Sequence, residues 1–270
     1  MLPSDDGKQH STPGVRADVD GFVTTITMDS PLTKNACNGD MFVTLGALFR
    51  QASYSGARAI VLTGAGGNFC AGADLSGQQS DSAERQHHLT ASMRVLAEVV
   101  LDIHTCPVPV VAKVDGLCVG AGLGVALAAD MIWCSDRARF SAIFAKRGLS
   151  LDFGTSWFLR QRIGVHKAKQ LAFTGEIFDG SRALDLGLVN AVVPAADLDS
   201  EVAAMVDAIA AGPPIAISIM KRQLDNAGSA SLAQCLEAEA LAQNVNVHTE
   251  DFAEAMTSYF ERRRPEFNGR

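Results

Sequence analysis

The segment that decides the fold reads VDGLCVGAGLG and covers residues 114–124. The apolar residues 108–114 that lead into it are typical of a buried strand, and its first half supplies a turn and a loop. Small residues at 121–130 favour a closely packed helix, and residues 131–135 form another apolar strand. Strand, glycine loop, helix and strand in this order predict an α/β architecture with parallel strands, whose carboxyl ends carry ligand-binding loops.

Another glycine loop lies upstream and is the first of the two in chain order. Residues 59–63 are a short apolar run that ends in GAGG at residues 64–67, which indicates a buried strand followed by a loop. A helix is expected over residues 81–105, because apolar side chains recur there at steps of three and four. They are Leu89, Met93, Leu96, Val100 and Ile103. Since both glycine loops follow strands of one parallel sheet, they can converge at the same edge.

A β-hairpin is expected near the start of the chain. Residues 15–19 and 22–28 are strand-like and flank Asp20-Gly21, a dipeptide that tolerates the backbone angles of a tight turn. The polar residues 1–14 before it are expected to form a flexible tail.

The end of the chain is predicted to be helical. After residues 189–193 the strand pattern stops, so we expect a core over residues 15–199 and a helical C-terminal subdomain, with a role in oligomerisation, over residues 200–270. An apolar stripe near the end either packs against the body of its own chain or contacts another copy, and both interpretations stay open. The stripe consists of Phe252, Ala255, Met256, Tyr259 and Phe260.

Composition and charge narrow the classes of protein. With 270 residues, 47% of them hydrophobic and 20% charged, the chain can bury a sizeable core. The formal net charge of -7 argues against nonspecific binding to nucleic acid or to a membrane surface. No run approaches the roughly 20 apolar residues of a membrane span, and residues 1–14 show no secretion signal, so a cytoplasmic protein is expected. The six cysteines include no C-x-x-C pair and no histidine at ligand spacing, so we expect reduced thiols and no metal site.

Two segments resemble the signature loops of the enoyl-CoA hydratase/isomerase (crotonase) superfamily. They read NFCAGADL at residues 68–75 and VDGLCVGAGLG at residues 114–124. Supporting matches are Lys34-Asn35-Ala36, Ala138-Arg139-Phe140, residues 184–193 and residues 263–270. The resemblance implies a crotonase-like spiral of strand-strand-helix repeats and a homotrimer or hexamer. It also implies a substrate carried as a coenzyme A thioester, with no permanently bound cofactor.

The resemblance assigns two backbone donors. In this family the Ala of the Gly-Ala-Asp triplet and the middle residue of the G-x-G element supply N–H groups, which correspond to Ala73 and Ala121. Two preorganised donors stabilise the negative charge that develops on a thioester oxygen during enolisation. Ala121 would also open a helix, whose N-terminal dipole favours negative charge.

The sequence departs from the family at the positions of proton transfer. The two glutamates with which hydratases activate water align with Gly124 and Phe144, and neither residue can transfer a proton. The segment GLSLDFG at residues 148–154 resembles the loop in which some isomerases of the family carry a single carboxylate, so Asp152 is the candidate base. Apolar neighbours are expected to desolvate Asp152 and raise its pKa. Its alternative role is to cap the helix that begins near Thr155.

For the coenzyme, the resemblance points to Lys34, Ala36 and Ala71, together with Asp74 and Leu75 of the first signature loop. Asp74 is expected to fix that loop, and Lys34 to meet a phosphate as a point charge. The basic residues 262–264 either meet a phosphate or form a solvated helix end.

Three functions therefore remain open. The first is an acyl-CoA isomerase that shifts a double bond with Asp152 as base. The second is an enoyl-CoA hydratase of fatty-acid β-oxidation that uses substituted residues, and the third is an acyl-CoA-binding protein without catalysis. A Rossmann dinucleotide site is disfavoured, because the third glycine of its G-x-G-x-x-G pattern would fall at Val125.

Overall fold

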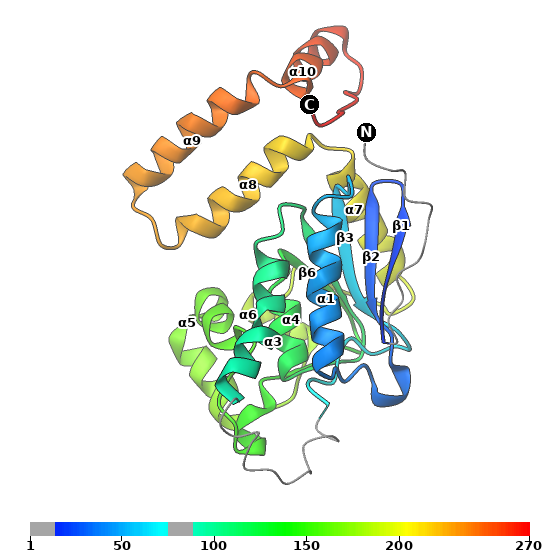
Figure 1. Cartoon of the computed structure of the whole chain (residues 1–270), viewed down its shortest axis with the longest axis vertical. Coiled ribbons are helices and arrows are strands. Elements are labelled where there is room, and N and C mark those ends of the chain that lie inside the picture. The colour runs from blue at the N-terminus through cyan, green and yellow to red at the C-terminus, as the bar shows by residue number, and fades with distance from the viewer. Residues whose placement is uncertain (1–13, 75–88) are drawn as a thin grey trace.

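The computed structural model describes residues 14–74 and 89–270. Over these residues, strands alternate with helices until the chain becomes wholly helical (Figure 1). The strands are β1 (Val15–Asp20), β2 (Val23–Met28), β3 (Ala59–Gly64), β4 (Val110–Val114), β5 (Leu117–Val119), β6 (Met131–Ser135), β7 (Arg139–Ser141), β8 (Phe178–Asp179) and β9 (Ala191–Val193). The helices are α1 (Gly39–Ala52), α3 (Leu89–His104), α4 (Ala121–Leu127), α5 (Thr155–Thr174), α6 (Gly180–Leu186), α7 (Leu198–Ala210), α8 (Pro214–Ala227), α9 (Leu232–Asn246) and α10 (Glu250–Glu261). Two short 3-10 helices are η1 (Pro31–Thr33) and η3 (Ile143–Arg147).

The described strands form two sheets. The larger sheet has the order β1-β2-β3-β4-β6-β9, and all its neighbours are parallel except β1 and β2. The smaller sheet has the order β5-β7-β8, with β5 and β7 parallel. A strand of the larger sheet is followed by a strand of the smaller sheet and then by a helix, as in β4-β5-α4 and β6-β7-α5. The predicted α/β spiral of strand-strand-helix repeats is therefore confirmed.

Three local features differ from the sequence-based expectations. Asp20 pairs with Val23, so the hairpin turn consists of Gly21 and Phe22, one residue later than predicted. β5 lies in a stretch predicted as a loop, because a strand of three residues is too short to show a period. Leu89 was expected on the buried face of α3 but is 60% exposed, and the buried residues of α3 lie only in its second half, at Val99, Val100 and Ile103. The predicted helical residues 81–88 lie outside the described residues.

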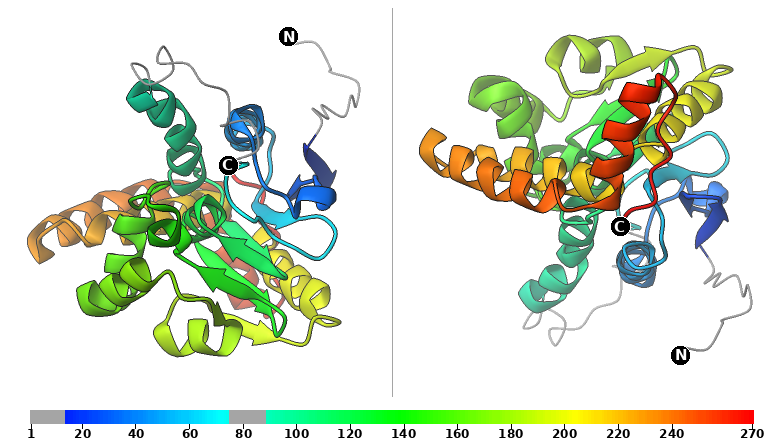
Figure 2. Two further views of the ribbon diagram at one scale, coloured as in Figure 1. Left: turned by 90° about the horizontal axis from the view of Figure 1, so that it is seen from below. Right: turned by 90° about the horizontal axis from the view of Figure 1, so that it is seen from above.

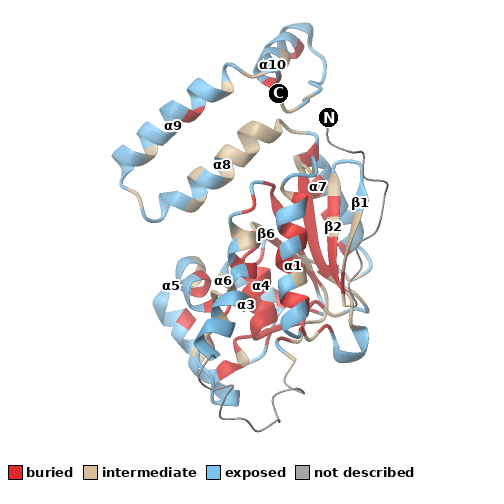
Figure 3. Cartoon of the chain, in the orientation of Figure 1, coloured by how far each residue is buried: buried red, intermediate tan, exposed pale blue. Residues whose placement is uncertain are grey.

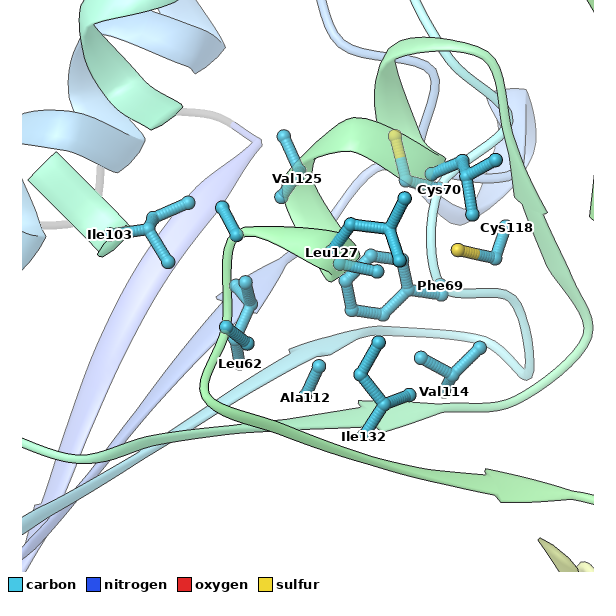
Figure 4. Packing of buried hydrophobic residues seen from close by; sticks show 14 of the residues in the cluster. Leu62, Phe69, Cys70, Ile103, Ala112, Val114, Cys118, Val125, Leu127 and Ile132 are labelled. Carbon is cyan, nitrogen blue, oxygen red and sulfur yellow. The ribbon is translucent and has the colours of Figure 1, made fainter. Parts of the chain in front are cut away.

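The main core lies between the larger sheet and helices α1, α3 and α4. Every residue of α4 is buried, because its alanines and glycines let the helix approach its neighbours closely. Figure 4 shows Leu127 of α4 packed near Phe69 and near Ile132 of β6. A second, smaller core lies between the sheet and α7, where Leu198, Val202 and Val206 pack with residues of β3, β4 and β6.

Helix α7 belongs to the body, although the predicted boundary between residues 199 and 200 falls inside it. Its apolar face covers the larger sheet, so the helical part that leaves the body begins at Pro214. α8 and α9 form a hairpin that projects from one end of the sheet, and α10 follows it (Figures 1 and 2). No single helix of the described ranges is long and apolar enough to cross a membrane; α7 and α8 meet those criteria only as a pair bent by 107°.

The C-terminal helices expose apolar side chains. α8 has no buried residue, and most of α9 and α10 is exposed (Figure 3). In the predicted stripe on α10, Tyr259 is 75% exposed and Phe260 is 80% exposed. Packing against the body of the chain therefore does not cover this stripe.

Candidate active site

The two glycine loops meet beside β5. The first loop is the segment after β3, residues 65–74, and the second is the segment around β5, residues 115–120. Cys70 forms a parallel bridge with Cys118: the N–H of Cys70 donates to the carbonyl of Leu117 over 2.8 Å, and the N–H of Val119 donates to the carbonyl of Cys70 over 3.0 Å. β5 leads directly into Ala121 at the start of α4. The first loop therefore runs alongside the strand that carries the second loop.

The N–H of Ala73 points away from the segment around Cys37, with which Ala73 pairs. Ala73 forms a parallel bridge with Cys37, but the bonds are made by its neighbours: Cys37 N–H donates to Gly72 O over 2.9 Å, and Asp74 N–H donates to Cys37 O over 2.8 Å. In a parallel ladder, a residue bonded in this way directs its own N–H to the opposite side. Among the described residues, no acceptor takes this N–H.

The N–H of Ala121 is the first of α4. Gly120 precedes the helix and provides no side-chain cap, and its carbonyl accepts from Leu123 and Gly124 over 3.0 and 3.2 Å. Ala121 thus has one of the N–H groups that a helix start leaves without an internal partner. Within the described chain it donates to no acceptor either.

Gly72 brings the two donors together. Its φ of +102° is a conformation that side chains disfavour, and a Cβ there would lie 3.1 Å from the carbonyl oxygen of Val119 and 3.8 Å from the nitrogen of Ala121. The backbone just before Ala73 therefore packs against the backbone just before Ala121. The structure brings the two predicted donor residues to one place.

Asp152 lies at the junction before α5. Its Oδ1 is buried and has no hydrogen-bond partner among the described residues, and burial raises the pKa of its carboxyl to about 6. α5 begins at Thr155 with Gly154 as its N-cap, and no side chain caps it. Asp152 contributes only its carbonyl, which accepts the N–H of Thr155 over 2.9 Å, so the alternative role of its side chain as a helix cap is wrong.

The space beside Gly124 is occupied by the loop of Asp152. A Cβ on Gly124 would lie 2.4 Å from the carbonyl oxygen of Phe153 and 3.0 Å from Oγ1 of Thr155. Phe153 itself has a positive φ of 46°, and its ring lies 4.5 Å from that of Phe42. Since Gly124 is about one helical turn from Ala121, the carboxylate loop lies next to the second donor. No side chain at position 124 fits this arrangement.

We expect Gly124→Ala to lower the free energy of unfolding by about 1–3 kcal/mol, because the added methyl group forces the Phe153 backbone to move. Urea denaturation followed by circular dichroism measures the change. Gly228→Ala is the matched control, since the nearest atom to a Cβ there is Nε2 of Gln161 at 3.7 Å. Equal unfolding free energies for both variants would contradict the close approach at Gly124.

The residues expected to bind coenzyme A lie together beside the first loop. The carbonyl of Lys34 accepts the N–H of Ala71 over 3.0 Å, and Ala36 follows in the same segment. Lys34 has an exposed side chain and a positive φ of 54°. The backbone N–H of Asp74 donates to the carbonyl of Cys37, and the role of its side chain stays a prediction. Leu75 lies outside the described residues.

Of the basic residues 262–264, Arg263 has side-chain partners within its own chain. Arg263 donates to Glu254 over 2.8 Å through Nη2 and to Glu261 over 2.7 Å through Nε. These contacts tie the end of α10 to the segment after it.

The cysteines are free thiols that fill the core. Cys37, Cys70, Cys106, Cys118 and Cys134 are buried, and the Sγ atoms of Cys37 and Cys70 are 3.9 Å apart. Burial raises the pKa of Cys134 to about 12. Within residues 14–74 and 89–270, no group of three or more His, Cys, Asp or Glu side chains has an arrangement that could hold a metal ion.

Two residues of the site had no predicted role. Asn35 was part of a matching motif, but nothing in its neighbours showed that its side chain reaches residues 65–68. Asn68 occurs in the first signature loop, where its side chain accepts the N–H of Leu117. Both contacts span long sequence separations, which a local pattern does not reveal.

Two neighbouring backbone N–H groups, with a partly buried carboxyl in the loop that packs on the helix of one of them, are the arrangement expected of an acyl-transfer or enolising type of site. A sequence profile of the enoyl-CoA hydratase/isomerase family matches residues 19–270. The chain belongs to this family, whose members act on coenzyme A thioesters, and it is an acyl-CoA enzyme.

Individual relatives carry different activities in their names. A probable enoyl-CoA hydratase of Rhodobacter capsulatus is 34% identical over 95% of this chain and 98% of its own length. The 1,2-epoxyphenylacetyl-CoA isomerase of Escherichia coli is 28% identical over 93% of this chain and 97% of its own. The relatives therefore fix the family and leave the reaction to be derived from the site.

Solved structures share the whole fold. An enoyl-CoA hydratase from Polaromonas sp. JS666 superimposes with a TM-score of 0.89 at 30% identity, covering 94% of this chain and 99% of that one. A structure from Thermobifida fusca in complex with CoA gives a TM-score of 0.81 at 29% identity, covering 87% of this chain and 93% of that one. The crotonase-type fold expected from the sequence is confirmed.

Proposed function

We propose that the enzyme shifts the double bond of an enoyl-CoA thioester, or of a related ring, with Asp152 as the base. The observation that carries the proposal is the carboxyl of Asp152, which is partly buried and ends in an oxygen without a partner. The loop that carries Asp152 packs beside Gly124, where hydratases of the family carry a glutamate, and Phe144 occupies the position of the other glutamate. The only acidic group of these three positions is Asp152.

The proposed reaction uses both backbone donors. The thioester oxygen accepts the N–H groups of Ala73 and Ala121, which stabilises the enolate that forms when a proton leaves the carbon chain. Asp152 takes that proton, the double bond moves by one carbon, and the same carboxyl returns the proton to the other end of the allylic system. Atoms and charge balance, and no other proton carrier is needed.

The raised pKa of Asp152 gives the reaction an acid limb. We expect kcat/KM to fall about tenfold for each pH unit below 6, because the protonated carboxyl cannot accept a proton. Above pH 6 the carboxylate form predominates and the rate levels off. A pH–rate profile of kcat/KM with an enoyl-CoA substrate measures this, and a limb near pH 4 instead would contradict the raised pKa of Asp152 in the free enzyme.

Hydration is the second candidate function. It is favoured by the name of the Rhodobacter capsulatus relative, which is a probable enoyl-CoA hydratase. Against it stand the residues at positions 124 and 144, which offer no carboxylate to orient and activate a water molecule. A hydratase would therefore have to use Asp152 alone.

One experiment distinguishes the candidates. A panel of acyl-CoA thioesters is incubated with the enzyme in deuterated water and followed by proton NMR. Deuterium incorporation with a moved double bond supports the isomerase, whereas a new hydroxyl-bearing carbon supports the hydratase. Binding without deuterium incorporation in any thioester would support the non-catalytic alternative and contradict the proposal.

We propose further that the chain assembles as a homotrimer or hexamer through α8, α9 and α10. The support is the row of exposed apolar side chains on these helices, among them Leu224, Leu232, Tyr259 and Phe260.

We expect Phe260→Asp to lower the molar mass measured by sedimentation equilibrium. The control is Tyr54→Asp, which changes another highly exposed aromatic residue outside these helices and should leave the molar mass unchanged. A monomeric unmodified protein would contradict the proposal.

The cytoplasmic location stays a prediction.

A further inference from the structure

Asn35 joins three backbone segments with one buried side chain. It is fully buried and has a positive φ of 58°, which Asn tolerates better than most residues. Its Oδ1 accepts the N–H of Ser30 over 2.8 Å, and its Nδ2 donates to the carbonyls of Ala65 and Asn68 over 2.8 and 2.7 Å. Both amide hydrogens are thus used, and both go to the first glycine loop.

Asn68 continues this connection toward the second loop. Its carbonyl accepts from Asn35, while its side-chain Oδ1 accepts the N–H of Leu117 over 3.1 Å. The next residues stay in register with β5, because Cys70 donates to the carbonyl of Leu117 over 2.8 Å. β5 then leads into Ala121, and the first loop leads into Ala73.

We propose that Asn35 and Asn68 are positioning residues that fix the separation of the Ala73 and Ala121 N–H groups. The inference rests on the proposed function, in which these two groups bind the thioester oxygen. Asn35 holds the first loop from one side, and Asn68 holds it against β5 from the other side. Neither asparagine touches the thioester oxygen; each acts through the backbone that it holds.

The physical reason lies in the direction of backbone hydrogen bonds. A donor stabilises an oxyanion only at hydrogen-bond distance and with good alignment, so a small shift of one loop weakens one of the two bonds. Without Asn68 Oδ1, the N–H of Leu117 loses its acceptor and the start of β5 loses one of the hydrogen bonds that hold it to the first loop. Without the Nδ2 of Asn35, two carbonyls of the first loop lose their donor.

The test measures polarisation of a bound carbonyl. Cinnamoyl-CoA is a suitable probe, because its conjugated thioester absorbs at longer wavelength when its oxygen is hydrogen-bonded and it has no saturated carbon from which a double bond could migrate. The variants are Asn68→Ala, Asn68→Asp and Asn35→Asp. Asn68→Asp keeps an acceptor oxygen for Leu117, and Asn35→Asp replaces the donor by a carboxylate while keeping the positive φ accessible.

Asn190→Ala is the matched control. Asn190 also accepts a backbone N–H through Oδ1, that of Ile132 over 2.8 Å, but in the strand pair β6-β9 away from the two loops. Its loss removes the same kind of hydrogen bond with no connection to Ala73 or Ala121.

We expect the unmodified enzyme to shift the absorbance of the probe to the red, and Asn68→Ala and Asn35→Asp to lose at least about half of that shift. Their kcat should fall by roughly tenfold, less than the loss of a whole donor, with KM changed by less than about threefold. Asn68→Asp and Asn190→Ala should keep the shift. If Asn35→Asp does not fold, the difference in red shift between Asn68→Ala and Asn68→Asp still tests the positioning role.

Two results would overturn the inference alone: a full red shift in Asn68→Ala, or an equal loss of shift in Asn190→Ala, which would indicate a general effect of lost stability. No red shift in the unmodified enzyme would instead remove the proposed oxyanion site, and the inference with it. The failure of the inference and the failure of the proposed function are therefore distinguishable.

Discussion

Asp152→Asn is expected to lower kcat for double-bond migration by about 10²–10⁴-fold, the contribution typical of a positioned general base. The amide has nearly the shape of the carboxyl but cannot accept a proton. Because the carboxyl it replaces is partly buried without a partner for Oδ1, we expect no loss of folding stability. Turnover followed by proton NMR and acyl-CoA binding followed by titration calorimetry measure the two effects separately.

The binding measurement makes this prediction specific. Since Ala73 and Ala121 are unchanged, Asp152→Asn should bind the thioester as tightly as the unmodified enzyme and only lose proton transfer. Asp185→Asn, an exposed aspartate on α6, is the control for the chemical change itself. Full activity of Asp152→Asn would eliminate Asp152 as the base.

Ala121→Pro is expected to lower kcat/KM by about 10²–10³-fold, as observed when one donor of an oxyanion site is removed. Proline lacks the N–H group but is favoured at the first position of a helix, where its fixed φ is already helical. The N–H of Ala121 makes no bond within the described chain, so its removal costs α4 no hydrogen bond. Steady-state kinetics with an enoyl-CoA substrate gives the change.

Ala121→Gly is the matched control for the proline variant. It removes the methyl group but keeps the N–H, so we expect its kcat/KM to stay within a few-fold of the unmodified enzyme. Thermal unfolding of both variants checks that α4 remains in place. Unchanged kinetics in a folded Ala121→Pro variant would show that this amide does not bind the thioester oxygen.

Several strands and helices of the body could be predicted from local patterns of apolar and small residues, whereas α1 and α6 were not predicted. The β3 and β6 runs are continuous and apolar, and α4 follows a glycine loop, so their types were evident from local sequence. β5 was missed because three residues show no period. The predicted boundary near residue 200 falls inside α7, because the apolar face of α7 resembles that of any amphipathic helix and only the folded chain shows that this face packs on the sheet.

The site was predictable where it depends on short motifs and not where it depends on contacts between distant segments. The resemblance of the two loops to the signature loops of the family predicted Ala73 and Ala121 as donors, since such a resemblance rests on consecutive residues. The roles of Asn35 and Asn68 required the loops to be folded together, because each side chain bonds a segment far away in sequence.

By itself, the sequence predicted the α/β class from periodicity, and its resemblance to the family predicted the two backbone donors, because periodicity and short motifs are local properties of the chain. Only the tertiary structure decided which distant segments pack against the loop of residues 114–124. It showed that Gly72 packs against the backbone before Ala121 and that Phe153 occupies the space a side chain at Gly124 would need. Both facts are close contacts between segments distant in sequence, and such contacts arise only when the whole chain packs at the density of a protein interior.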